Sequence, residues 1–156
     1  MPDLSELTQT ITVRPIAYPQ TYDLRHRVLR AHQPKEAAEY LEDHEVDSLH
    51  LGAFQECRLV GVISMYQKDQ PDLDGGYHYR IRGMAVEPEL QSKGIGTRML
   101  QRGMQWLQER EVPLVWCNVR LSATAFYQKY GFTVLGPEFD LPPLGPHKVM
   151  VCSFTD

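Results

Sequence analysis

The sequence predicts an α/β protein with a mixed, mostly antiparallel central sheet and helices on both faces of that sheet. Short segments rich in β-branched and aromatic residues alternate with polar breaks, which is typical of strands. One long segment carries apolar residues at helical spacing. At 156 residues the chain has the length of one ordinary domain. We therefore expect a frayed, polar N-terminus over residues 1–10 and a single domain over residues 11–156.

The composition argues against several functional classes. A formal net charge of −4 is unfavourable for a nucleic-acid-binding surface, which needs concentrated Lys and Arg. No apolar run approaches the roughly 18 residues of a membrane span, and the N-terminus lacks the pattern of a signal peptide. The three cysteines match no zinc spacing. We therefore expect a cytoplasmic protein with reduced thiols, no bound metal, and neither nucleic acid nor membrane as a partner.

The first third of the chain predicts one strand, two helices and an acidic segment. Residues 11–14 form a short strand that ends at Pro15. Pro19 favours the start of a helix that runs to about residue 31, and a second helix is predicted over residues 36–41. Acidic residues recur in the next segment, as a solvated face or as a lip that attracts a cationic amine: Glu36, Glu39, Glu42, Asp43, Glu45 and Asp47.

The middle of the chain predicts three strands. Residues 48–54 and 58–65 flank a short polar break and therefore read as a hairpin. Residues 67–76 form a polar loop rich in Asp, Pro and Gly. Residues 77–86 form the next strand, which stops before Pro88.

The clearest predicted helix covers residues 94–110. Its apolar stripe faces the sheet, and the glycine within the stripe indicates a close approach of helix and strand: Ile95, Met99, Gly103, Trp106 and Leu107. Residues 113–119 then form a buried strand.

The C-terminal part predicts a short helix and two final strands. Ser122 can cap a helix over residues 123–130, and Gly131 stands where a C′ glycine belongs. Residues 132–135 and 148–154 are the strands. A proline-rich loop separates them, with Pro142, Pro143 and Pro146.

The turn before the long helix has two glycines spaced by one residue. A dinucleotide fingerprint would need glycine where Met99 stands, and a P-loop would need Gly-Lys-Ser/Thr at its end. Glycine lets the backbone approach a ligand, and first-turn N–H groups together with the helix dipole attract an anion. The turn is therefore either a phosphate site, aided by a lysine, or a tight turn of structural origin: Gln91-Ser92-Lys93-Gly94-Ile95-Gly96-Thr97.

With its surroundings, this turn resembles motif A of the GCN5-related N-acetyltransferase (GNAT) superfamily. That motif is Gln/Arg-x-x-Gly-x-Gly/Ala after a strand, and Gln91, Gly94 and Gly96 fill its fixed places. Residues 82–86 resemble the preceding strand. Residues 116–120 and 125–132 resemble the family's next strand and its helix ending in Tyr-Gly-Phe. The order of elements agrees from about Ile11 to the C-terminus.

The resemblance implies an acetyl-CoA site in a sheet splayed between its fourth and fifth strands. Backbone groups of Met84 and Val86 would pair with the pantetheine arm, and an N–H near Met84 or Ala85 would polarise the thioester carbonyl. Asn118 would touch the arm from the fifth strand. The pyrophosphate would be held by backbone N–H groups of Gln91, Ser92, Lys93, Gly94, Ile95, Gly96 and Thr97.

The resemblance also implies that Tyr127 is the acid that protonates the departing CoA thiolate. The alternative is a packing role for this ring. Candidates for the general base are open: His78, Tyr79, His147, Glu87, the acidic segment, or a water molecule. Arg82 or Arg120 could bind a substrate carboxylate or could instead pair with an acidic neighbour, and each histidine could be structural. The candidates for the substrate side are His78, Arg82 and His147.

The sequence thus predicts an N-acetyltransferase that moves an acetyl group directly from acetyl-CoA to a primary amine of a small molecule or peptide. One alternative is a non-catalytic acyl-CoA-binding sensor, and another is a nucleotide-binding regulator. A covalent mechanism through Cys117 would need an activating base that the local sequence does not supply. Members of this superfamily often form homodimers, and we expect the same assembly to be open to this chain.

Overall fold

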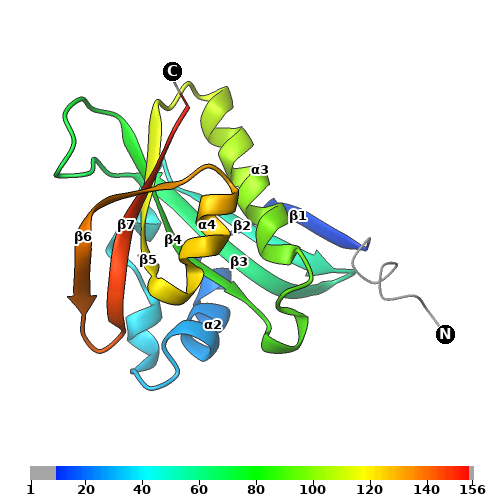
Figure 1. Ribbon diagram of the computed structural model, residues 1–156. Helices are drawn as coiled ribbons and strands as arrows, with labels where there is room; N and C mark the ends of the chain where they lie inside the picture. The colour runs from blue at the N-terminus through cyan, green and yellow to red at the C-terminus, as the bar shows by residue number, and fades with distance from the viewer. Residues whose placement is uncertain (1–9, 155–156) are drawn as a thin grey trace. The chain divides into compact units, whose positions relative to one another are not determined.

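The computed structural model describes residues 10–154 (Figure 1). The predicted frayed N-terminus therefore lies, apart from Thr10, outside the described residues. The chain divides into two compact units, one comprising Met1–Tyr66 and Gly83–Leu107, the other comprising Gln67–Arg82 and Gln108–Asp156. Each unit is described by itself.

A seven-stranded sheet has the strand order β1-β2-β3-β4-β5-β7-β6. The pairs β1–β2, β2–β3, β5–β7 and β6–β7 are antiparallel, whereas β4 and β5 are parallel. This confirms the predicted mixed, mostly antiparallel sheet. The strands are β1 Ile11–Pro15, β2 Leu49–Gln55, β3 Arg58–Gln67, β4 His78–Val86, β5 Leu114–Arg120, β6 Thr133–Leu141 and β7 Gly145–Ser153.

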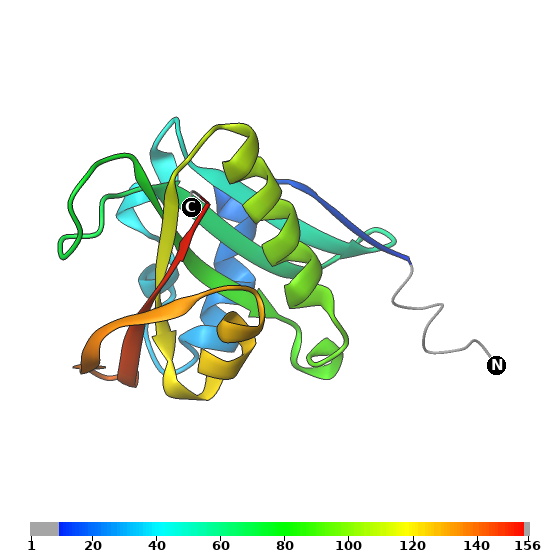
Figure 2. The same cartoon turned by 45° about the horizontal axis from the view of Figure 1, so that its top comes forward.

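In the first unit, helices cover both faces of the strands (Figures 1 and 2). A Cβ atom placed on Gly61 of β3 would lie 3.0 Å from Cε of Met99, so Gly61 faces α3 (Ile95–Glu109). The next residue, Val62, points the opposite way because side chains alternate along a strand. There it joins Leu24 of α2 (Tyr22–Leu24) in a buried cluster. The predicted two-sided arrangement is therefore confirmed.

Helix α3 presents its predicted apolar stripe to the sheet, with two differences. Ile95, Met99, Gly103 and Leu107 are buried as expected, but Leu100 is buried too and Trp106 is only partly covered. Gly103 contacts Met65 of β3, whose Sδ would lie 2.7 Å from a Cβ at this position. The close approach predicted from this glycine is confirmed.

The N-terminal helices are less regular than predicted. Residues 18–29 form successive 3₁₀, α and π turns, Tyr18–Thr21, Tyr22–Leu24 and Arg25–Leu29. The predicted helix over residues 36–41 is wrong, because two short 3₁₀ turns, Lys35–Ala38 and Leu41–His44, occupy this region. The carbonyl of Ala38 accepts a hydrogen bond from the Arg25 side chain at 2.9 Å, and the chain turns extended after it.

In the second unit, β5, β7 and β6 form an antiparallel sheet beside the short helix α4 (Thr124–Lys129). Gly131 follows α4 with φ of +92°, which confirms the predicted C′ glycine. The predicted proline-rich loop is wrong. Residues 133–141 and 145–153 form a long hairpin instead, and Pro146 pairs with Asp140 beside a tight turn. Pro146 is tolerated there because it is the second residue of β7 and lies beyond the register with β5, which ends at His147.

Candidate functional site

The turn into α3 exposes the start of that helix. The N–H of Arg98 donates to the carbonyl of Gly94 at 3.1 Å, so Gly94 is the cap residue and the ladder starts at Arg98. The N–H groups of Ile95 and Gly96 precede this first rung. Gly94 is exposed with φ of +88°, and within residues 10–154 no atom beyond its chain neighbours lies within 4 Å of the place where its Cβ would be. Open space at Gly94 thus adjoins the positive end of the helix dipole and the first N–H groups of the helix, which is the physical basis of an anion site.

Gln91 connects this turn to the end of β4. Its side-chain Nε2 donates to the carbonyl oxygen of Val86 at 3.0 Å. The residue assigned to the glycine motif thus fixes the turn against the strand that precedes it. Lys93, which lies in the turn between Gln91 and Gly94, is exposed and adds positive charge beside the helix start.

Glu87 anchors the same strand end. It follows β4 directly and is only 6% exposed. Its Oε1 accepts from Nη2 of Arg27 and its Oε2 from Nη2 of Arg58, each at 2.6 Å. Both carboxylate oxygens are therefore engaged in ion pairs, which favours an anchoring role over the base role considered from the sequence. Arg27 and Arg58 are distant from Glu87 in sequence, so no local pattern predicts these ion pairs.

The end of β4 also carries the residues expected to meet the thioester. Ala85 is buried against Leu24 and Val62, while Met84 and Val86 are partly exposed. Gly83 precedes them with φ of +69°, a left-handed conformation that interrupts the regular strand as at a β-bulge. The sequence had not singled out this glycine.

In the second unit, Tyr127 of α4 is buried in an aromatic cluster. Its ring centroid lies 5.2 Å from that of Phe126 and 5.3 Å from that of Phe132. Burial raises the pKa of the Tyr127 hydroxyl well above its ordinary value, with a further rise from nearby Cys117. The hydroxyl therefore keeps its proton at neutral pH. Burial likewise raises the pKa of the Cys117 thiol, which argues against a thiolate nucleophile.

The two candidate histidines differ in which ring nitrogen is engaged. Nδ1 of His78 accepts a hydrogen bond from the backbone N–H of Gln70 at 3.1 Å, which uses the lone pair that a neutral base would need. Nδ1 of His147 lies 2.8 Å from the carbonyl oxygen of Gly145 and must donate to it. In neutral His147 the lone pair is therefore on Nε2. Both side chains are buried, at 4% exposure.

The structure brings together one group of the predicted residues. Residues 84–86 and 91–97 belong to the first unit, where the Gln91–Val86 hydrogen bond joins them. The other predicted residues belong to the second unit: His78, Arg82, Asn118, Tyr127 and His147. Asn118, on β5, is partly exposed and pairs with Val149 of β7. The splay of β4 from β5 beside Asn118 stays a prediction.

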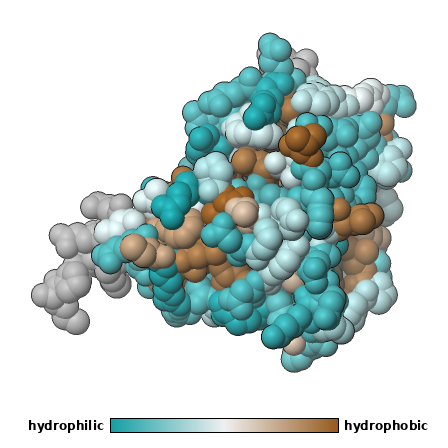
Figure 3. Space-filling view, turned by 180° about the vertical axis from the view of Figure 1, so that it is seen from behind, coloured by the Kyte–Doolittle hydropathy of each residue, from teal (hydrophilic) through white to brown (hydrophobic). Residues whose placement is uncertain are grey.

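Within residues 10–154, no cluster of His, Cys, Asp and Glu has the arrangement of a metal site. Over the same residues, no helix is long and apolar enough to cross a membrane. The surface seen from behind is mostly hydrophilic, with hydrophobic side chains in separate groups (Figure 3).

Comparisons with known proteins agree with this geometry. The model of the acetyltransferase (GNAT) family matches residues 18–132. The uncharacterised N-acetyltransferase YitI of Bacillus subtilis (strain 168) is 38% identical over 140 residues, which cover 90% of this chain and 94% of YitI.

Solved structures show the same fold. The ribosomal-protein-S18-alanine N-acetyltransferase of Escherichia coli superimposes with a TM-score of 0.72 and 17% identity, over 94% of this chain and 95% of that one. A GNAT family acetyltransferase of Elizabethkingia anophelis, solved with acetyl-CoA bound, gives a TM-score of 0.68 and 18% identity, over 93% and 99%. The chain therefore belongs to the GNAT family of acetyltransferases, and its chemistry is acyl transfer.

Proposed function

We propose that this protein transfers an acetyl group from acetyl-CoA to a primary amine of a small molecule or peptide, directly and within a ternary complex. The observation that carries the proposal is the exposed helix start at Gly94, where open space at the glycine cap adjoins the N–H groups that precede the first rung of the helix. Related folds support the choice of cofactor, because the Elizabethkingia anophelis enzyme holds acetyl-CoA and an aminoglycoside 6′-N-acetyltransferase was solved with coenzyme A.

The glycine turn is proposed to hold the pyrophosphate of the cofactor. The donors are the backbone N–H groups of residues 91–97, and Lys93 adds a positive charge. The left-handed conformations of Ser92 and Gly94, with φ of +64° and +88°, turn the chain back toward the helix start. Such a turn presents successive N–H groups on one side, as anion-binding nests do.

The end of β4 is proposed to hold the pantetheine arm and the thioester. Met84 and Val86 would pair with the arm as with a neighbouring strand, while the N–H of Met84 or Ala85 would donate to the thioester oxygen. Asn118 of β5 would contact the arm. The carbonyl oxygen of Val86 already accepts a hydrogen bond from Gln91, so the pantetheine arm would donate to the second lone pair of this oxygen.

Tyr127 is proposed to assist the leaving group. The amine nitrogen attacks the thioester carbon, the C–S bond breaks, and the electron pair leaves on the CoA sulfur. An unperturbed thiol has a pKa near 8.5, below that of the buried phenol. Tyr127 therefore acts mainly by donating a hydrogen bond to the sulfur as negative charge develops there.

The acceptor side is proposed to involve His147, Arg82 and His78. His147 is the preferred base among the histidines, because its Nδ1 is held by Gly145 while Nε2 carries the lone pair. His78 has its Nδ1 lone pair engaged by Gln70, which favours a structural role. A water molecule could instead carry the proton away from the ammonium group.

Thiol release from acetyl-CoA in the presence of an amine panel, including polyamines, tests the proposal. Release with at least one amine, together with CoA binding by calorimetry, is the expected result. CoA binding without release across the panel would favour a non-catalytic acyl-CoA sensor. An absence of CoA binding would contradict both, and stabilisation by ATP or NAD alone would point to a nucleotide-binding regulator.

A further inference from the structure

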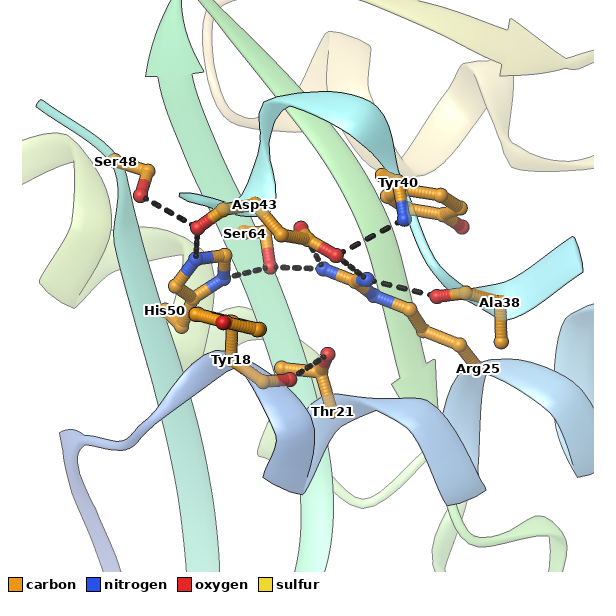
Figure 4. Close-up of polar contacts among 9 residues, drawn as sticks. All are labelled: Tyr18, Thr21, Arg25, Ala38, Tyr40, Asp43, Ser48, His50 and Ser64. Carbon is orange, nitrogen blue, oxygen red and sulfur yellow. Dashed lines mark hydrogen bonds and ion pairs between the residues drawn. The ribbon is translucent and has the colours of Figure 1, made fainter. Parts of the chain in front are cut away.

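A buried ion pair joins the N-terminal turns to the acidic segment (Figure 4). The side chains of Arg25 and Asp43 are both 0% exposed. Nη1 of Arg25 donates to Oδ2 of Asp43 at 2.7 Å, and Nη2 donates to Oδ1 at 2.9 Å. Further donated bonds reach the Ala38 carbonyl at 2.9 Å and the Ser64 hydroxyl at 2.7 Å. The guanidinium group is therefore fixed in position and orientation.

Tyr40 completes this arrangement. Its backbone N–H donates to Oδ2 of Asp43 at 3.0 Å, and the guanidinium carbon of Arg25 lies 4.0 Å from the centroid of its ring. The ring is almost fully covered, at 4% exposure. We call Arg25, Tyr40 and Asp43 the Arg25 assembly.

The Arg25 assembly contacts β4 at Gly83. A Cβ atom placed on Gly83 would lie 3.0 Å from Nε of Arg25 and 3.0 Å from Cε2 of Tyr40. The φ of Gly83 is +69°, a conformation that residues other than glycine rarely adopt. Both the tight space and the backbone conformation therefore favour glycine at the point where β4 meets the Arg25 assembly.

The Nε–H group of Arg25 faces Gly83 but makes no hydrogen bond there. Among the described residues, Nε is buried and has no acceptor, although both other nitrogens are fully engaged. An unpaired buried donor lowers stability. The edge that carries it lies against the bare backbone of Gly83. The Arg25 assembly therefore provides β4 with a close steric contact at Gly83 and not with an additional hydrogen bond.

We infer that the Arg25 assembly is a positioning device for the thioester. It holds Gly83 in its left-handed conformation and thereby fixes the direction of the peptide group that leads into Met84. This inference rests on the proposed function, which places the thioester oxygen at the N–H of Met84 or Ala85. Arg25 touches no reacting atom, so it is a positioning residue and acts through Gly83.

The test compares two ligands that need no acceptor. Coenzyme A lacks the acyl carbonyl, whereas S-(2-oxopropyl)-CoA carries a stable ketone in place of the thioester. Isothermal titration gives the ratio of their dissociation constants, which reports the contact to the carbonyl. In wild type the ketone should bind more tightly than coenzyme A.

Two variants disturb the contact at Gly83 in different ways. Tyr40→Ala deletes the ring against Gly83 and leaves the ion pair. The double variant Arg25→Met/Asp43→Leu replaces the fixed guanidinium group with a flexible side chain and leaves no unpaired buried charge. Each should bind coenzyme A within about threefold of wild type and lose about three- to tenfold of the preference for the ketone. Tyr40→Ala keeps the test decisive if the double variant does not fold, as judged by circular dichroism.

Two control variants distinguish the loss of the contact at Gly83 from a general loss of structure in the protein. Tyr40→Phe retains the ring at Gly83 and should retain the preference. Arg14→Met removes a guanidinium group from the edge strand β1, where its carbon lies 3.8 Å from the ring centroid of Phe54 on β2, and this change should have no effect. Folded variants that keep the wild-type preference, or that weaken both ligands equally, would overturn the inference. A wild type that binds both ligands equally would also overturn it, whereas one that binds neither would instead refute the proposed function.

Discussion

Ser64 Oγ lies 2.7 Å from Nδ1 of His50 and also accepts a hydrogen bond from Arg25. Nε2 of His50 lies 3.2 Å from the backbone carbonyl of Asp43, which can only accept, so this nitrogen carries the ring proton. The Ser64 hydroxyl then donates to Nδ1. A second ring proton would displace that donated bond and place a positive charge near Arg25. The buried network therefore requires neutral His50.

The first prediction concerns stability at acidic pH. Burial lowers the pKa of His50, nearby Arg25 lowers it further, and contacts with Asp43 partly offset both effects. Because the folded pKa lies below the unfolded value of about 6.5, the unfolded chain binds more protons as pH falls below that value. The free energy of unfolding from urea titrations should therefore decrease between pH 7 and pH 5. In His50→Gln, which keeps a donor toward Asp43 but does not titrate, the decrease should be smaller. Equal pH dependence in both proteins would contradict the network.

The second prediction concerns the glycine turn. Gly96→Leu places a bulky side chain on the first turn of α3, where the proposed pyrophosphate lies. The dissociation constant for coenzyme A should rise at least about tenfold, because the backbone can no longer approach the phosphates. Gln101→Leu is the matched control, since it adds the same side chain to an exposed position of the same helix. Unchanged affinity in a folded Gly96→Leu protein would remove the turn from the cofactor site.

The third prediction concerns Tyr127. The change Tyr127→Phe keeps the ring packed between Phe126 and Phe132 but removes the hydroxyl. Turnover should fall about tenfold or more, which is the rate effect expected when a catalytic acid or hydrogen-bond donor is removed. The dissociation constant for coenzyme A should stay nearly the same. Steady-state kinetics with an amine that wild type accepts provides the measurement. Tyr130→Phe, on the same helix, serves as the control. A full-rate Tyr127→Phe enzyme would leave only the packing role.

The fourth prediction concerns the packing of α3 on β3. A side chain at Gly103 would collide with Met65, which is 0% exposed and has little room to move. Gly103→Leu should therefore lower the free energy of unfolding by about 1–3 kcal/mol, the usual cost of overpacking. Gln105→Leu, at an exposed position of α3, should change stability far less. Urea denaturation of the two variants checks the difference, and equal effects would argue against the close approach.

The elements with a strong local pattern could be predicted from the sequence. The spacing of Ile95, Met99 and Gly103 predicts α3 and its buried face, and Gly131 predicts the end of α4. Where the local pattern was weak, tertiary contacts decided the outcome. The predicted helix at 36–41 is replaced by tight turns, and the prolines after residue 141 lie in and beside a hairpin rather than in a long loop.

The candidate site divides in the same way. By itself, the sequence determined the order of strands and helices and the glycine turn at Gly94, because helical periodicity, strand alternation and turn chemistry depend on residues close together in the chain. Only the tertiary structure decided that Asp43 is buried rather than part of a solvated acidic face, and that Gly83 lies against Arg25. Arg25 meets Asp43 and Ser64 across 18 and 39 residues of sequence. Contacts over such separations form only when the elements pack together, so no local pattern in the sequence records them.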